Sequence, residues 1–197
     1  MQVLARLKSW KVVAVVFIAV IFLLPPCSFA EEQRQLQLSE QKIKAGLIYN
    51  FLKYTEWPSA KMADPTSPII ICIFGSEDPF DRHLQPIEDR TVNQRTIAIR
   101  HISNTEQMTS CHMLFLSSDE QVQWPVLHRF LADKSVLTVG DFEGFSRSGG
   151  MIEFGTQDNR IQIELNINAI NAAQLHVHDS LRRLAKTTHT PSHGGAE

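Results

Sequence analysis

The sequence has no large excess of charge of either sign. Its 197 residues include 19 Lys or Arg and 21 Asp or Glu, a formal charge of -2. The first 30 residues carry Arg6, Lys8 and Lys11 and no acid, so their removal leaves 16 bases (19 less those three) against 21 acids. A mildly acidic chain has no electrostatic footprint for nucleic acid and no basic patch for anionic lipid. The composition therefore predicts no nucleic-acid partner.

The sequence also lacks a recognisable catalytic or metal-binding motif. There is no H-E-x-x-H and no nucleophile elbow. Ser148-Gly149-Gly150 lacks the Lys and Ser/Thr of a phosphate loop. His176-Val177-His178 followed by Asp179 offers two metal ligands, but no third is obviously placed to complete a site. We predict no enzyme, metal or cofactor, and structural roles for His101 and His112, which flank predicted strands.

Long hydrophobic runs are absent except for Val12 to Leu24, which has 13 residues. A transmembrane helix needs about 20 residues. Three bases precede the run and Ser28-Phe29-Ala30 follows it, the order of a secretory signal. We predict a cleaved signal peptide over 1–30. An uncleaved anchor, or lipidation at Cys27 after a poorly suited Pro25-Pro26, remains an alternative.

The remaining chain has the length of one domain. We predict a single domain over 31–186 and a flexible tail over 187–197, where the residues are polar with Gly, Pro and His. About 70% of the unfolded chain's surface is buried in a domain of this size, so no metal is needed for folding.

Cysteines are few, and only Cys72 and Cys111 remain after export. An even number in an oxidising compartment favours a disulfide. Closing a loop of about 39 residues stabilises the fold by roughly 4 kcal/mol in the chain-entropy model. The alternative is two buried free thiols, but both cysteines lie in or beside apolar strands, which favours the bridge.

Hydrophobic periodicity predicts a helix over Gln33 to Tyr54, with Ser39 as a possible inner cap and Trp57-Pro58 after its end. Further on, strands and helices alternate until a final hairpin with its turn at 155–159, which predicts an α/β fold. Its mixed parallel and antiparallel sheet has about six strands, flanked by helices in three layers. The predicted strands are Ile69 to Phe74, Thr96 to Ile102, Met113 to Leu116, Val136 to Val139, Met151 to Phe154 and Arg160 to Ile167. The predicted helices are Pro79 to Ile87, Asp119 to Ala132 and a C-terminal segment that breaks near Gln174 and ends at Ala185.

Several segments resemble, in order, the YfiR family of periplasmic proteins. The first is Lys44 to Pro58, KAGLIYNFLKYTEWP, and the second is Cys111 to Ser117, CHMLFLS. The others are Val136 to Val139, Gly149 to Phe154, Glu164 to Asn166 and Leu181 to Ala185. Each motif is weak alone, but together they cover about residues 40 to 186.

The resemblance implies a periplasmic repressor that binds the sensor region of an inner-membrane diguanylate cyclase and lowers cyclic di-GMP. It also implies sequestration by an outer-membrane, peptidoglycan-binding lipoprotein, a homodimer, and a bridge between Cys72 and Cys111. The chain departs from the family in lacking a second cysteine pair around Gly149-Gly150, where Phe145 and Ile152 stand. The loop around Gly149-Gly150 therefore has no disulfide to hold it.

Four residues are candidates for binding a partner or ligand. Asn50 lies close to the apolar face of the first helix and needs polar partners if buried. Glu164 and Asn166 share one strand face, which is either solvated or a polar patch covered by the C-terminal segment. Trp57 packs in the core, or else anchors an interface.

The leading hypothesis is a non-catalytic repressor of an inner-membrane signalling protein, above all a diguanylate cyclase. Regulation of a sensor histidine kinase is an alternative form of this hypothesis. The second hypothesis is a small-molecule sensor whose ligand enters beside Asn50 and Glu164. The third hypothesis is a small hydrolase that uses Glu164 or a histidine.

Overall fold

The computed structural model describes residues 27–75, 80–157, 160–185 and 187–188. The chain divides into two compact units, Met1–Ser39 and Glu40–Glu197. In the first unit the described part is the beginning of helix α2 (Cys27–Lys53), whose side chains are exposed from Gln33 to Ser39. The hydroxyl of Ser39 donates to the carbonyl of Leu36 at 2.7 Å. Ser39 is therefore inside the helix rather than at an N-cap. Residues 1–26 of the predicted signal peptide lie outside the described residues.

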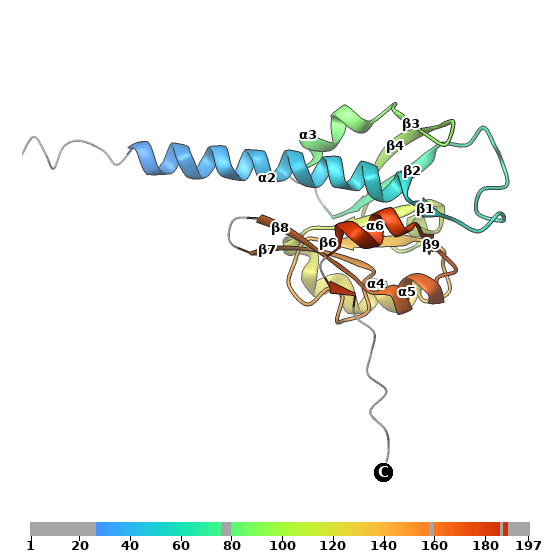
Figure 1. The fold of residues 1–197 in the computed structure, drawn as a ribbon. Coiled ribbons are helices and arrows are strands. Elements are labelled where there is room, and N and C mark those ends of the chain that lie inside the picture. The colour runs from blue at the N-terminus through green and yellow to red at the C-terminus, as the bar shows by residue number, and fades with distance from the viewer. Residues whose placement is uncertain (1–26, 76–79, 158–159, 186, 189–197) are drawn as a thin grey trace, which may run out of the picture. The chain divides into compact units, whose positions relative to one another are not determined.

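The second unit is built on one mixed sheet (Figure 1). Its longer strands are β2 (Ile69–Phe74), β4 (Arg95–Ile102), β5 (Met113–Leu116), β6 (Leu137–Gly140), β7 (Ile152–Gln157) and β8 (Arg160–Leu165). Two-residue strands, β3 (Thr91–Val92) and β10 (Thr187–Thr188), lie at its edges in the order β10-β8-β7-β6-β5-β2-β4-β3. Neighbouring strands from β4 to β7 pair in parallel, whereas β8 is antiparallel to β7 and β3 to β4. The predicted mixed α/β sheet with six main strands is confirmed.

Helices cover both faces of this sheet. One core lies between the sheet and residues 40–53 of α2, and it also takes side chains from α3 (Asp81–Leu84), α5 (Ile167–Ala172) and α6 (Asp179–Leu184). The other core lies under α4 (Trp124–Leu131), whose Trp124, Leu127 and Leu131 are buried. Because β2 is buried on both faces, its side chains alternate between the two cores: Ile71 belongs to the first and Cys72 to the second. This is the three-layer arrangement that the sequence predicts.

The structure differs from the sequence-based expectation in several places. Helix α2 begins at Cys27 instead of Gln33, and β7 extends to Gln157, into the predicted turn. The segment predicted as one helix over 119–132 begins as a 3-10 helix, Ser118–Gln123, and becomes α4 with Pro125 in its first turn. Proline is tolerated there because the first N–H groups of a helix have no partner inside it. A two-stranded sheet of β1 (Thr55–Glu56) and β9 (His176–Val177) was not predicted. The first two residues of the predicted tail form β10 beside β8, and residues 189–197 lie outside the described residues.

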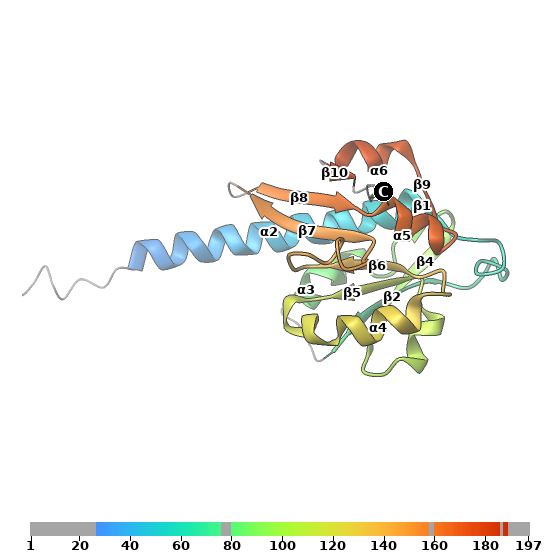
Figure 2. The same cartoon turned by 90° about the horizontal axis from the view of Figure 1, so that it is seen from below.

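The β7–β8 hairpin reaches beyond the carboxyl end of the neighbouring β6 (Figure 2). Only the first two residues of β7 pair with β6, through Val139 with Ile152 and Gly140 with Glu153. The connection from β6 to β7, residues 141–151, therefore lies beside the hairpin. We call its first ten residues, 141–150, the β6–β7 loop.

Candidate functional site

Two glutamates face each other across the hairpin beneath the β6–β7 loop. Glu153 on β7 and Glu164 on β8 are cross-strand partners. The hydroxyl of Ser146 lies 2.9 Å from Oε2 of Glu153 and 3.0 Å from Oε2 of Glu164. Glu153 is buried, at 5% exposure, whereas Glu164 is half-buried. One loop residue thus bridges two carboxylates.

Backbone N–H groups of the β6–β7 loop also donate hydrogen bonds to the carboxylate of Glu153. Its Oε1 accepts the N–H of Gly144 at 3.1 Å, and its Oε2 accepts the N–H of Ser146 at 2.8 Å. Asn166 adds a bond from the far end of β8, because its Nδ2 donates to the carbonyl of Ser146 at 2.8 Å. Its Oδ1 accepts the N–H of Ala169 and caps α5. The loop is therefore tied to the hairpin by hydrogen bonds to a buried carboxylate, which are among the stronger ones.

An aromatic side chain anchors the same loop from within. Phe145 is fully buried, with its ring centroid 4.3 Å from that of Trp124 and 5.1 Å from that of Phe142. A Cβ at Gly140 or Gly150 would come within 2.4 or 2.2 Å of the Phe145 ring. Only glycine at these two positions lets the ring sit this close to the backbone. Packing of Phe145 thus holds the loop in place.

An ion cluster around the buried Lys44 joins the start of the loop to α2. Nζ of Lys44 lies 2.7 Å from Oδ1 of Asp141 and 2.8 Å from Oε1 of Glu40. Glu40 also accepts the hydroxyl of Thr156 on β7 at 3.1 Å. Burial lowers the pKa of Lys44, but its bonds to both carboxylates outweigh that and raise it. Burial likewise opposes ionisation of Glu40, and the bond to Lys44 holds the pKa of Glu40 below its ordinary value.

Cys72 and Cys111 form the disulfide that the sequence favours, with both residues fully buried beneath α4. The neighbouring His112 is buried and structural, as predicted. Its Nδ1 accepts the N–H of Ile70 at 3.1 Å. Burial, together with the charges of Lys61 and Arg95, lowers the pKa of His112 to about 4. The ring is neutral at pH 7, which its acceptor role requires.

The structure does not bring the four predicted site residues together. Asn50 lies half-buried on α2, on the face of the sheet that carries Ile163 and Leu165. Glu164 points to the other face, because neighbouring strand residues alternate. The two therefore do not line one pocket.

Glu164 and Asn166 do belong to one polar patch, but its cover differs from the expected C-terminal segment. The cover is the β6–β7 loop, through Ser146. Trp57 is buried at 9% exposure, and its Nε1 donates to the carbonyl of His112 at 3.0 Å. Its burial argues against a role as an exposed anchor.

Sequence reasoning missed Ser146 and Glu153. Glu153 stands in the run Met151 to Phe154, where an acid among apolar residues of a buried strand was the available signal. A buried carboxylate needs donors, and the glycine-rich loop before it was the nearest source. Ser146 had no signal of its own, because its role depends on where the loop folds back.

No group of three or more His, Cys, Asp or Glu in the described ranges has the arrangement of a metal site. His176 and His178 have ring centroids 6.0 Å apart, and His178 pairs with Glu56 at 2.8 Å. None of the helices within those ranges is long and apolar enough to cross a membrane.

Comparison with known proteins gives a structural neighbour and a family. The chain is similar to the solved ABC domain in complex with L-Trp from Streptococcus pneumonia, with a TM-score of 0.45 and 8% identity. The match covers 64% of this chain and 56% of that one, too distant a likeness to carry an argument. A family model described as YfiR/HmsC-like matches residues 41–186. This span contains the disulfide, the polar patch and every strand of the main sheet other than β10. The chain belongs to the YfiR/HmsC-like family.

Proposed function

We propose that the chain is a non-catalytic periplasmic regulator that binds and represses an inner-membrane diguanylate cyclase, lowering cyclic di-GMP. Membership of the YfiR/HmsC-like family over residues 41–186 carries this proposal. The family is regulatory, and its members act through a protein partner in signalling. Export by a cleaved signal peptide over residues 1–30 belongs to the same proposal.

Repression in this scheme is a matter of differential affinity. A binding protein shifts a cyclase toward its inactive state only if it binds that state more tightly. Moving the population from 1:99 to 99:1 requires a preference of about 5.5 kcal/mol. A rigid contact surface helps, because less conformational freedom is lost on binding.

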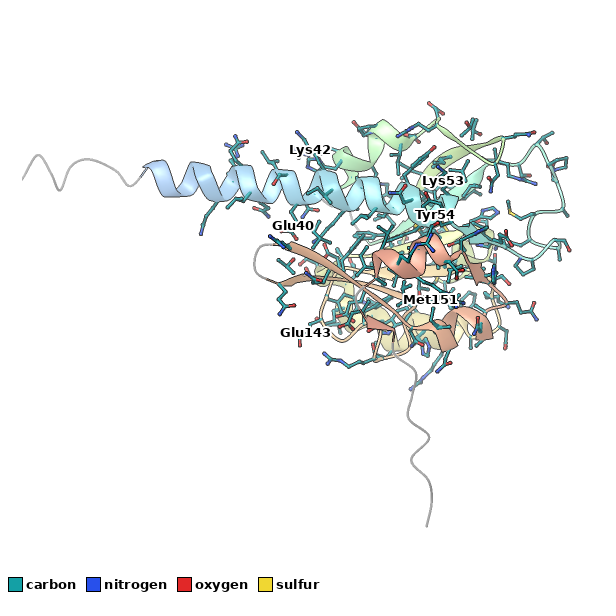
Figure 3. The ribbon with its side chains drawn as sticks, in the orientation of Figure 1. Glu40, Lys42, Lys53, Tyr54, Glu143 and Met151 are labelled. Carbon is teal, nitrogen blue, oxygen red and sulfur yellow. A yellow bond between two sulfur atoms is a disulfide. The ribbon has the colours of Figure 1, made fainter. Side chains whose placement is uncertain are left out.

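We place the contact surface on the β6–β7 loop and the neighbouring face of β8. Glu143 and Arg147 are exposed on this loop (Figure 3 labels Glu143), and Glu164 and Asn166 are half-buried beside it. Phe145 and Glu153 hold the loop from below. The surface is thus preorganised and carries charges of both signs, which favours a polar protein partner.

Other partners remain part of the proposal. A homodimer and an outer-membrane, peptidoglycan-binding lipoprotein follow from the family pattern. Asn50 lies on α2, away from the proposed surface, and is suited to a second contact of this kind. The single small-molecule pocket between Asn50 and Glu164 is not proposed, because the two lie on opposite faces of the sheet.

A capture experiment tests the proposal. Residues 31–197 are immobilised and exposed to solubilised membranes of the host, and the bound proteins are identified by mass spectrometry. We expect an inner-membrane GGDEF protein that is lost with Glu143→Lys and retained with Lys42→Gln. Lys42 is exposed on α2, where it is labelled in Figure 3. Capture of a sensor histidine kinase would keep the inhibitor mechanism but replace the cyclase, and no specific capture would count against a protein partner.

A further inference from the structure

Positive charge gathers at the edge of the sheet opposite the β6–β7 loop. Adjacent parallel strands begin at the same edge, so the segments that precede β2, β4, β5 and β6 lie near one another. Lys61 lies in the connection before β2, Arg95 begins β4, and Lys134 lies three residues before β6. The nearly neutral composition did not predict this local concentration of cations.

Backbone oxygens are the hydrogen-bond partners of Lys61 and Arg95. Nζ of Lys61 donates to the carbonyl of Thr109, just before β5, at 2.7 Å. The guanidinium of Arg95 donates to the carbonyls of three residues in the connection before β2, namely Met62, Asp64 and Ser67. Among the ion pairs of the described residues, none includes Lys61, Arg95 or Lys134. Lys44, by contrast, has two carboxylates.

Lys61 and Lys134 act on each other, whereas the charge of Arg95 acts on Asp64 and helps to lower the pKa of that carboxyl group. Burial and the charge of Lys134 lower the pKa of the Lys61 ammonium. The two nearby acids are Asp64, which is already hydrogen-bonded, and Asp133, which is exposed. Asp64 uses both carboxylate oxygens for Thr66 and Ser67, and Asp133 is exposed beside Lys134. A half-buried ammonium beside a second cation is an arrangement that an anion would stabilise.

We propose that Lys61 and Lys134 form a binding site for a phosphate-type oxyanion at the amino edge of the sheet. Lysine binds phosphate as a point charge with freely oriented donors, whereas Arg95 is already held by carbonyls. Nζ of Lys61 carries three N–H donors, of which the Thr109 carbonyl takes one. The chemistry is that of a phosphate group, whether free in solution or on a lipid headgroup. The site is remote from the proposed partner surface and does not depend on the proposed function.

Titration with inorganic phosphate tests the site. Residues 31–197 are titrated at constant ionic strength, with sodium chloride as the reference, and binding is followed by NMR. We expect saturable binding that Lys61→Gln and Lys134→Gln each weaken by about tenfold, the range of a lost charge-assisted bond. Lys42→Gln, which removes an exposed lysine on α2, leaves binding unchanged.

A second readout guards against a variant that fails to fold. In the wild-type chain, bound phosphate should raise the pKa of the Lys61 ammonium, as measured from its side-chain resonances. Vesicles containing an anionic phospholipid, compared with zwitterionic ones, distinguish a lipid headgroup from free phosphate. Absence of saturable binding of both phosphate and vesicles overturns the proposal, as does equal weakening by Lys42→Gln.

Discussion

Glu153 and Glu164 lie opposite each other on β7 and β8, and both carboxylates reach the hydroxyl of Ser146. That hydroxyl has one proton, so it donates to one carboxylate at a time. Two like charges directly opposite each other destabilise a sheet. The Ser146 hydroxyl that bridges the two carboxylates therefore affects how stable this part of the hairpin is.

Replacement of Ser146 by Ala should loosen the loop. The substitution removes a donor from the buried Glu153 but leaves the backbone N–H bond at 2.8 Å. Loss of one bond to a buried charged group costs about 1–3 kcal/mol. Urea unfolding should show this loss for Ser146→Ala. Ser110→Ala, which removes an exposed hydroxyl bonded to the carbonyl of Gln107, should change stability by less than about 0.5 kcal/mol. Equal effects of the two changes would contradict the bridging role.

Gly140→Ala should destabilise the fold, although alanine is ordinarily easy to accommodate. The new Cβ would meet the Phe145 ring at 2.4 Å, so that the ring or the strand must shift. Overpacking of this kind costs about 1–3 kcal/mol. Gly46→Ala is the matched control, because nothing lies within 4 Å of its added Cβ on α2. There we expect a gain of up to about 1 kcal/mol from helix propensity. A tolerated Gly140→Ala would show that Phe145 does not anchor the loop.

Reduction of the disulfide should lower stability substantially. Cys72 and Cys111 are 39 residues apart, and the chain-entropy model assigns such a loop about 4 kcal/mol. The comparison is urea unfolding of residues 31–197 with and without a reductant. Its control is the Cys72→Ala, Cys111→Ala double variant, which should be insensitive to reductant. A wild-type chain that unfolds at the same urea concentration in both conditions would contradict the prediction.

Stability should also fall as the pH is lowered from about 6.5 to about 4. The pKa of His112 is lowered to about 4 in the folded chain, against about 6.5 in an unfolded one. Between these values the unfolded chain binds the proton and the folded chain does not, so stability increases with pH. Urea midpoints at pH 5 and pH 7 should differ less for His112→Gln than for the wild type. Identical pH dependence would show that another group is responsible.

Sequence patterns were sufficient for the main strands. Ile69–Phe74 and Met113–Leu116 have the predicted bounds, because a continuous apolar run fits a parallel strand buried on both faces. Strands of two residues, such as Thr55–Glu56 and His176–Val177, carry no periodicity, and their pairing depends on tertiary contact. The same limit applies to the polar patch. Asn166 was identified from its position, but Ser146 joins it only through the folded loop.

The central claim is repression of a diguanylate cyclase, and cyclic di-GMP measured in the host tests it most directly. A strain that lacks this chain should contain more cyclic di-GMP, and an exported wild-type copy should restore the lower level. Glu143→Lys, which reverses a charge on the exposed loop, should restore it less well than Lys42→Gln. Deletion of the captured cyclase should abolish the difference between the strains. Unchanged cyclic di-GMP in the strain without the chain would contradict the account.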